Sequence, residues 1–483
     1  MIKNILGWLL KYEALVFIIC LVILLRIPSL FEPYWYGDEG IYLTIGKAIR
    51  AGVPLYTGIH DNKPPLLYFA AALSGGNQFW FKFIATIWVV AEIPVFWCLA
   101  KKMFSKEKYV YLSTAIFAFL ICWPKLEGNI ANAEIFFLLP TLIAFNMLWR
   151  DVLNFRKIFW AGFLFGIGGL FKMPAIIEAG VWPIWWLSGK DKNWFKKSLV
   201  LGVGVMMPII LSVGYYAVQG GAREYLTAAW AQNLPYLSSW KATSSEKGIY
   251  SVKGRALVTL GLILAVWLVS KKEDKKIRIL GWWFVITLFS SLLSGRPYPH
   301  YLLQIIGSLA LWLILLLAGT KKEKGLGLIF AALLVATTQV FNFYGYRVVS
   351  YYDNFINFAL NKKTKAEYFS WFDAKVNDNY EIAGKITAGS QPEDRIFVWG
   401  DEPMIYAISG LLPTGKYTVK YHIKDFRAEE TTMKALKLNL PKYIVSFGNE
   451  DELPGLELLL KQDYLIQGTV GKALVYRRIM GGI

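Results

Sequence analysis

Ionisable side chains gather in one short segment that closely follows the first apolar stretch of a very hydrophobic chain. They are Asp38, Glu39, His60, Asp61 and Lys63. Charged groups beside a bilayer are costly and usually serve a function. A carboxylate can act as a general base, and a lysine can hold a phosphate group as a point charge. This segment is therefore the first candidate for a functional site.

Two short helices are predicted to position these groups. Residues 39–51 fit an amphipathic helix, with Asp38 in the N-cap position and Gly52 where the helix stops. A helix of this kind would lie flat in the membrane interface. A pair of prolines favours a second helix, from Pro65 to about Ser74, because proline suits the first helical turn. Lys63 then lies at the junction of loop and helix, close to the membrane surface.

Two of these groups, Asp38 and Lys63, also have an ordinary structural explanation. A role as a helix cap would by itself explain Asp38, because capping is a common use of aspartate. Lys63 can anchor the segment to lipid headgroups. Asp38 and Glu39 are adjacent on a helix and point in different directions, so at most one of them is expected to be the direct base.

The composition is that of an integral membrane protein. The chain has 483 residues, of which 55% are hydrophobic and 18% charged, and this is far too apolar for a soluble protein of this length. The three cysteines lie inside apolar stretches and are predicted to be small buried hydrophobes. Eleven stretches are candidate transmembrane helices: Ala14–Leu30, Phe79–Ala100, Tyr109–Trp123, Ala131–Trp149, Ile158–Phe171, Pro174–Leu187, Leu199–Val218, Ala256–Ser270, Ile279–Leu293, Tyr301–Ala318 and Leu326–Phe343.

The positions of the basic residues predict which ends of these helices face the cytoplasm. Every second short loop is basic, with Lys101, Lys102, Lys106, Lys108, Arg150, Arg156, Lys157, Lys190, Lys192, Lys196, Lys197, Lys271, Lys272, Lys275, Lys276, Arg278, Lys321, Lys322 and Lys324. The positive-inside rule places these loops and the N-terminus in the cytoplasm of a multi-pass plasma-membrane protein. The net charge of +18 then follows from topology, and no nucleic-acid partner is expected. All three histidines and the candidate segment share the extracytoplasmic side.

The tail differs in kind from the rest of the chain. We predict a transmembrane domain over residues 1–345 and an extracytoplasmic α/β domain over residues 346–483. The predicted strands of the tail are Arg395–Trp399, Tyr417–Val419, Lys442–Phe447 and Ala473–Tyr476. The predicted helices between them are Val376–Ala388, Glu402–Ser409, Glu429–Leu436 and Leu456–Gln462.

The motifs resemble those of one known superfamily. The pair Asp38-Glu39 and the run Asp61–Tyr68 (DNKPPLLY) look like the protein mannosyltransferases and aminoarabinose transferases, which are GT-C-fold glycosyltransferases. Asn132-Ala133-Glu134 resembles their second acidic motif. Gly169–Pro174 resembles their Thr-Lys-Gly-Pro turn, and Arg296–Leu303 resembles their Arg-x-x-His-Tyr-x-x-Pro turn. The resemblance covers about residues 14–318 of the chain.

The resemblance implies a polytopic GT-C fold and a reaction. The reaction is an inverting transfer of a sugar from a polyprenyl-phosphate donor to a hydroxyl of a glycan, lipid or protein acceptor, at the extracytoplasmic face. The implied general base is Asp38, with Glu39 as a helper. The groups implied to bind the donor phosphate are Lys63, Lys172, Arg296, Tyr298 and His300. The groups implied to support the site or the acceptor are Tyr42, Asp61 and Glu134.

A divalent metal is left open by the motifs. Aminoarabinose transferases carry a metal-binding glutamate directly before the motif lysine, where this chain has Asn62. The remaining candidate ligands are Asp61, Glu134 and His300, and cationic side chains can replace a metal in this role. Lys172 can also simply snorkel toward the membrane surface, and His300 can cap the tenth apolar stretch.

The alternative function is a transporter or flippase that moves a lipid-linked sugar without chemistry. Such a protein predicts polar groups near the middle of the spans and repeated halves in the sequence. In this chain the polar groups lie at the outer ends of the predicted spans, and no internal repeat is evident. The sequence therefore favours the transferase over the transporter.

Overall fold

The computed structural model describes residues 12–149, 153–236, 248–270 and 275–479. Arg150, Lys271 and Lys272 of the predicted cytoplasmic loops lie outside these residues, as does the N-terminus. The chain divides into two compact units. The helical unit comprises Met1–Ile27, Ala85–Ala217 and Trp230–Val348, and the α/β unit comprises Pro28–Ile84, Val218–Ala229 and Val349–Ile483. The segment with Asp38 and Lys63 therefore belongs to the same unit as the C-terminal tail.

Helices form over all eleven predicted apolar stretches. They are α2 (Glu13–Leu30), α5 (Gln78–Met103), α6 (Glu107–Cys122), α7 (Ala133–Leu148), α8 (Phe155–Phe171), η2 with α9 (Met173–Gly180, Val181–Ser188), α10 (Trp194–Val218), α13 (Val252–Val269), α14 (Lys275–Ser291), η5 with α15 (Pro299–Ile305, Ile306–Ala318) and α16 (Lys321–Val340). Among the described residues, six are long and apolar enough to cross a membrane: α2, α5, α10, α13, η5 with α15, and α16. The chain is therefore a helical multi-span membrane protein.

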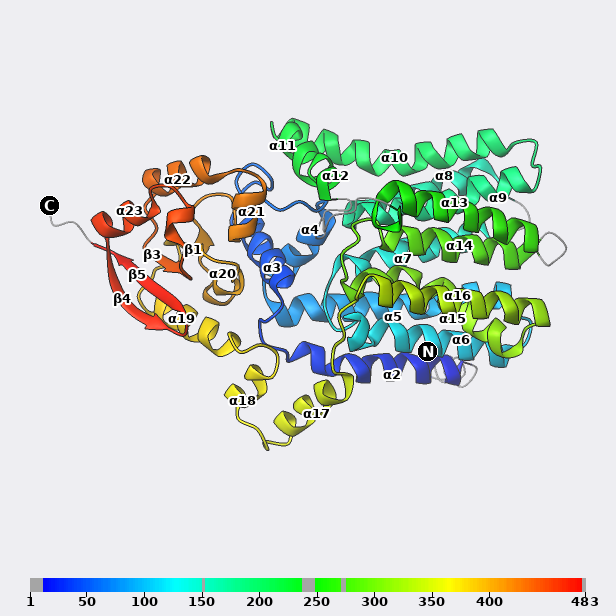
Figure 1. Ribbon diagram of the computed structural model, residues 1–483, viewed down its shortest axis with the longest axis horizontal. Coiled ribbons are helices and arrows are strands. Elements are labelled where there is room, and N and C mark those ends of the chain that lie inside the picture. The colour runs from blue at the N-terminus through cyan, green and yellow to red at the C-terminus, as the bar shows by residue number, and fades with distance from the viewer. Residues whose placement is uncertain (1–11, 150–152, 237–247, 271–274, 480–483) are drawn as a thin grey trace, which may run out of the picture. The chain divides into compact units, whose positions relative to one another are not determined.

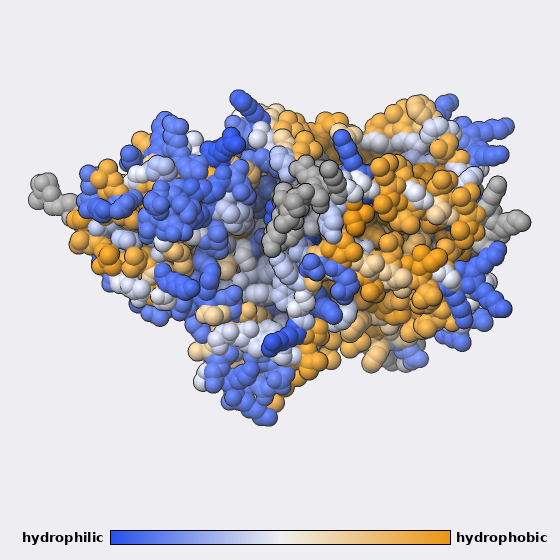
Figure 2. Space-filling model, in the orientation of Figure 1, coloured by the Kyte–Doolittle hydropathy of each residue, from blue (hydrophilic) through white to orange (hydrophobic). Residues whose placement is uncertain are grey.

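Small residues bring helices of the helical unit close together. A side chain at Gly162 would collide with the Leu201 carbonyl, and one at Gly204 would collide with the Phe159 carbonyl. Backbone contact of this kind between α8 and α10 is typical of helices in membranes, where small residues line the interfaces. Figure 1 shows the long helices of this unit running side by side, and Figure 2 shows hydrophobic residues gathered over them.

In the α/β unit, the N-terminal segment forms α3 (Gly37–Arg50) and α4 (Leu66–Leu73). The predicted N-cap is wrong, because Tyr36 occupies that position and Asp38 lies inside the first turn. Gly52 ends the helix as predicted, with a φ of +80° that favours glycine. Most of α3 is buried in protein, because Gly46 packs on the backbone of α4 and Gly40 packs on Met404 of the tail.

The tail contains one five-stranded mixed sheet in the order β2-β1-β3-β5-β4. Its strands are β1 (Arg395–Trp399), β2 (Leu412–Pro413), β3 (Tyr443–Ser446), β4 (Tyr464–Val470) and β5 (Ala473–Arg478). β1 pairs in parallel with β2 and β3, and the other pairs are antiparallel. Three predicted strands are confirmed. The predicted strand Tyr417–Val419 is wrong, because these residues lead directly into a helix and pair with no strand.

Helices cover both faces of this sheet. The predicted helices correspond to α19 (Val376–Ala388), α20 (Met404–Ser409), α22 (Glu429–Leu438) and α23 (Leu456–Asp463), and the sequence missed α21 (Lys420–Asp425). Successive residues of β1 point to opposite faces. Ile396 and Val398 join the core under α19 and α20, while Phe397 and Trp399 join the core under α21, α22 and α23. The tail also contains α17 (Val348–Ala359) and α18 (Lys365–Ser370).

Candidate active site

Two carboxylates converge on one lysine in the α/β unit. The Lys63 Nζ atom lies 3.5 Å from Asp38 Oδ2 and 3.7 Å from Asp61 Oδ2. Asp38 is about one-third exposed at 32%, whereas Asp61 is buried at 1%. Tyr56 donates a hydrogen bond of 2.8 Å to the Lys63 carbonyl and so fixes the backbone of the loop. The structure therefore brings the predicted base, Asp38, and the predicted phosphate-binding lysine into contact.

Asp61 is held as an anion by its surroundings. The Tyr68 hydroxyl donates to Oδ2 at 2.6 Å, and the Asn62 N–H donates to Oδ1 at 2.8 Å. Burial alone would raise the pKa of Asp61, but the Lys63 charge, the His422 ring and the two hydrogen bonds outweigh burial and lower it to about 2. Asp61 is thus an ionised carboxylate at neutral pH, and it supplies the negative charge beside Lys63.

Tyr42 orients the more exposed carboxylate. Its hydroxyl donates to Asp38 Oδ2 at 2.9 Å, one helical turn away on α3. Burial, and then the nearby Asp38 charge, raise the pKa of Tyr42 well above its ordinary value. The phenol therefore stays protonated and remains a donor. The Lys63 ammonium also lies 5.0 Å from the centre of the Tyr42 ring, within reach of a cation–π interaction.

Glu39 faces a different part of the same unit. Its Oε2 atom lies 3.1 Å from Lys82 Nζ, which also lies 2.7 Å from Glu32 Oε2. Tyr351 donates a hydrogen bond of 2.6 Å to the other oxygen of Glu32. All four side chains are buried. Glu39 therefore points away from Asp38, as its position next to Asp38 on a helix predicts, and it helps to anchor the first turn of α3.

In the helical unit, Lys172 and Glu134 form an ion pair. Glu134 lies in the first turn of α7, and Lys172 lies where α8 ends and η2 begins. The ammonium of Lys172 lies 4.1 Å from the centre of the Tyr301 ring. Two predicted residues of distant sequence motifs are thus brought together.

His300 pairs with a carboxylate that the sequence did not single out. Its Nδ1 atom contacts Glu127, which lies in the turn after η1 (Pro124–Leu126) with a φ of +56°. The Tyr298 ring stacks on His300 at 5.8 Å, and the Tyr301 ring meets it edge-on at 4.6 Å. Tyr301 thus connects His300 with the Lys172 pair. A glutamate after a Trp-Pro turn gave no motif from which this role could have been predicted.

The predicted residue Arg296 and the nearby Gln304 also have definite surroundings. The backbone N–H of Arg296 donates to the Ser294 hydroxyl at 3.2 Å, which fixes the turn before η5. Gln304, which stands near the proline of the family pattern, donates to the Pro174 carbonyl at 3.2 Å and to Glu178 at 2.9 Å. This amide therefore stabilises the turn that follows Lys172.

The side chains do not form a metal site at the three predicted ligands. Asp61 contacts Lys63, Glu134 contacts Lys172, and His300 contacts Glu127. In the described part of the chain, no three histidine, cysteine or acidic side chains converge in a way that could hold a metal ion. The carboxylates of Asp61 and Glu134 are each paired with a lysine instead.

An apolar cavity of about 160 Å³ lies between α13, α14 and α16 of the helical unit. Apolar side chains make up most of its lining, and the buried Arg255 lies at its edge. The Arg255 guanidinium donates to the carbonyls of Tyr250 at 2.8 Å and Leu293 at 3.0 Å. Arg255 is not among the residues predicted from the sequence, although an arginine at the start of an apolar stretch is itself a signal of a functional site.

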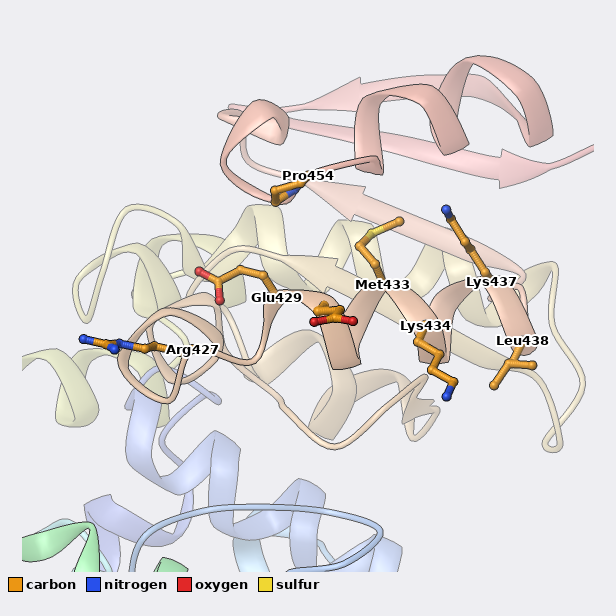
Figure 3. A pocket seen from close by; sticks show the side chains of 8 residues that line it. Arg427, Glu429, Met433, Lys434, Lys437, Leu438 and Pro454 are labelled. Carbon is orange, nitrogen blue, oxygen red and sulfur yellow. The ribbon is translucent and has the colours of Figure 1, made fainter.

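A separate concavity of about 760 Å³ lies along α22 of the α/β unit. Figure 3 shows Met433 and Lys437 on the side of α22 where Pro454 lies, with Lys434 on the opposite side. The lining mixes acidic and basic side chains and includes none of the predicted site residues.

Comparison with solved structures gives a match to ArnT from Cupriavidus metallidurans bound to undecaprenyl phosphate. The TM-score is 0.62 at 13% sequence identity, and the match covers 98% of both chains. The oligosaccharyltransferase of Archaeoglobus fulgidus, tethered to an acceptor peptide with the NVT sequon, matches with a TM-score of 0.43 at 14% identity over 98% of this chain and 75% of that chain. No family model and no curated protein matches the sequence. The chain thus has an ArnT-like fold, and the predicted resemblance to GT-C enzymes is confirmed for the fold.

Proposed function

We propose that this protein is an inverting glycosyltransferase that moves a sugar from a polyprenyl-phosphate donor to an acceptor hydroxyl. The observation that carries the proposal is the contact of Lys63 with Asp38 and Asp61. It offers a partly exposed carboxylate and a cation within 3.5 Å of each other. The ArnT-like fold supports the proposal, since that solved structure contains undecaprenyl phosphate.

In the proposed reaction, Asp38 takes the proton of the acceptor hydroxyl. The acceptor oxygen then forms a bond to the anomeric carbon, and the bond between that carbon and the phosphate oxygen breaks. The polyprenyl phosphate leaves with the electron pair, and fixed positive charge stabilises it. Lys63 supplies this charge, and Tyr42 holds Asp38 in a fixed orientation. General-base and electrostatic effects of this kind need no metal ion.

The helical unit is assigned to the donor. Lys172, Arg296 and His300 are proposed to bind its phosphate, with Tyr298 stacked beside the histidine. Lys172 is already paired with Glu134, so the phosphate would compete with that carboxylate for the ammonium. The apolar cavity beside Arg255 suits part of an isoprenoid tail, because its lining is apolar and a cation lies at its edge.

The topology is part of the same proposal. All eleven predicted stretches cross the plasma membrane, the N-terminus is cytoplasmic, and the site with the α/β domain faces outward. The basic loops support this orientation through the positive-inside rule. The acceptor is a glycan, lipid or protein that is reached from the extracytoplasmic side.

A transfer assay tests the proposal. Purified protein in proteoliposomes is given a panel of polyprenyl-phosphate sugars and acceptor extracts, with the Asp38→Asn variant as the inactive control. We expect one donor to yield free polyprenyl phosphate and a glycosylated acceptor with the wild-type protein only. Movement of the intact donor across the bilayer without release of polyprenyl phosphate would instead identify a flippase.

A further inference from the structure

Residues of the C-terminal tail contact the loop that carries Lys63. The His60 N–H donates a hydrogen bond of 2.9 Å to the Lys416 carbonyl of the tail. The His60 ring meets Tyr417 and Phe426 edge-on, at 5.2 Å and 5.0 Å between ring centres. All these residues belong to the α/β unit. The loop is therefore held by residues on either side of α21, a helix more than 350 positions further along the chain.

His422 of α21 lies next to Asp61, the residue that follows His60 and supplies the buried carboxylate beside Lys63. Its Nε2 atom lies 3.5 Å from Asp61 Oδ1, and the side chain is buried at 4% exposure. Burial lowers the pKa of His422 below its ordinary value, although Asp61 opposes this effect. Among the described residues, no hydrogen-bond donor or acceptor reaches Nδ1. A neutral ring with its proton on Nε2, directed at Asp61, fits both observations.

The position of α21 beside the loop that follows β1 explains how the helix is held near Asp61. β1 and β3 are parallel neighbours, and the chain passes to β2 on one side before it returns to β3 on the other. The carboxyl ends of strands at such a switch point usually border a ligand crevice. Here the first residues of α21 lie beside the loop after β1, because the Lys420 N–H donates to the Gly400 carbonyl at 3.0 Å and the Tyr421 N–H donates to Asp401 at 3.0 Å.

We propose that His422 is a positioning residue for the transfer: by donating to Asp61 it keeps that carboxylate beside Lys63, and so fixes the ammonium that faces the leaving phosphate. The proposal rests on the function proposed above for Lys63. Asp61 has two oxygens to satisfy, and Oδ2 is already shared between Tyr68 and Lys63. Oδ1 receives the Asn62 N–H and faces His422, so the imidazole restrains the carboxylate through the oxygen that Lys63 does not approach.

Two substitutions of His422 distinguish a positioning role from a purely space-filling role in packing. His422→Gln keeps a side-chain N–H near the place of Nε2, whereas His422→Leu keeps the volume but removes the donor. We expect His422→Leu to lower kcat/KM for the donor about tenfold, the usual scale for one hydrogen bond to a charged group, and His422→Gln to stay within about twofold. In a Lys63→Ala background, His422→Leu should have almost no further effect, because coupled residues are not additive. Equal fold losses in both backgrounds, or equal losses for both substitutions, would overturn the proposal.

A second measurement does not depend on the reaction. The rate at which an amine-reactive reagent labels Lys63 is followed by mass spectrometry, with the exposed Lys461 as the reference. His422→Leu should speed the labelling of Lys63 about tenfold and His422→Gln should not. Unchanged labelling of Lys63 in the His422→Leu protein would refute the positioning role even if no donor is ever found. A wild-type protein that transfers no sugar, but shows the labelling difference, would refute only the proposed function.

The buried Lys82, which is 0% exposed, reports whether a variant is folded. Its labelling should stay negligible in all three proteins. If His422→Leu exposes Lys82, His422→Asn takes its place, since an asparagine is smaller and cannot reach Asp61 from the same backbone position. The same criterion for Lys63 then decides the proposal.

Discussion

Replacing Asp61 with asparagine tests whether the charge of this buried carboxylate stabilises the α/β unit. Asparagine has nearly the shape of a protonated aspartic acid, so the substitution removes the charge and little volume. Lys63 would lose one of its two carboxylates, and the Tyr68 hydroxyl would lose an anionic acceptor. We expect the variant to fold but to unfold at a lower temperature.

The size of this effect follows from the pKa of Asp61. The folded protein lowers it from 3.8 to about 2. Each pKa unit corresponds to about 1.4 kcal/mol, so the ionised form is stabilised by about 2 kcal/mol relative to the neutral form. Because Asp61 is only 1% exposed, this value needs little correction for solvent screening. For a unit of this size the midpoint of unfolding should fall by about 4–8 °C.

The stabilisation by ionised Asp61 should also depend on pH in a direction that can be measured. Because the folded pKa lies below the unfolded one, the stabilisation is complete above pH 3.8 and is lost as the pH falls toward about 2. The gap between wild type and Asp61→Asn should therefore be constant from pH 7 to about pH 5 and close between about pH 4 and 2. Thermal unfolding in detergent, followed by tryptophan fluorescence, measures both quantities.

Asp394→Asn is the matched control. Asp394 is also paired with a lysine, Lys442, at 2.7 Å, but its side chain is 28% exposed and solvent weakens the pair. Exposed ion pairs contribute about 0–1 kcal/mol, so this variant should lose less than half as much. The argument would be refuted by an Asp61→Asn protein that melts with the wild type at pH 7, or by two variants with equal losses.

Four further predictions concern activity, folding and topology. Asp38→Asn should reduce kcat by about 10²–10⁴, the usual contribution of a general base, with an unchanged melting temperature; full activity in the transfer assay would remove Asp38 as the base. Lys63→Ala should lower kcat/KM for the donor by about 10², and unchanged donor kinetics would leave Lys63 as a lipid anchor. Lys82→Met would leave two buried carboxylates without their shared ammonium and should destabilise the protein by about 3 kcal/mol or more, seen as poor recovery after solubilisation. In a background without native cysteines, Lys125→Cys should react with a membrane-impermeant thiol reagent from outside and Lys106→Cys should not; the reverse pattern would invert the topology.

Local sequence patterns were sufficient for most of the helices and strands. Apolar stretches of helical length predict a helix whatever lies around them, and all eleven are helical. Turn signals and β-branched runs gave three strands of the tail. Tyr417–Val419 has the same local character, but no neighbouring strand is in place to pair with it. Strand formation depends on a partner, which a local pattern does not contain.

The candidate site was likewise only partly predictable from the sequence. The motif around Lys63 singled out Asp38 and Asp61, and the structure places both beside the lysine, a pairing that the sequence did not predict. The separation of Asp38 from Glu39 also followed from helix geometry. Glu127 and Lys82 were not predicted, because the role of each depends on a partner far away in the sequence. The partner of Glu127 is His300, and that of Lys82 is Glu39.

By itself, the sequence determined that this is a multi-span membrane protein with the ionisable residues Asp38, Asp61 and Lys63 close after its first apolar stretch, because hydrophobicity, helix period and residue type are local properties. Only the tertiary structure decided which charges neutralise one another. It placed His422, from a helix that the sequence did not predict, against Asp61, and it directed Glu39 toward Lys82 and away from Lys63. The physical reason is that a buried charge must find its partner in space, and packing alone selects that partner.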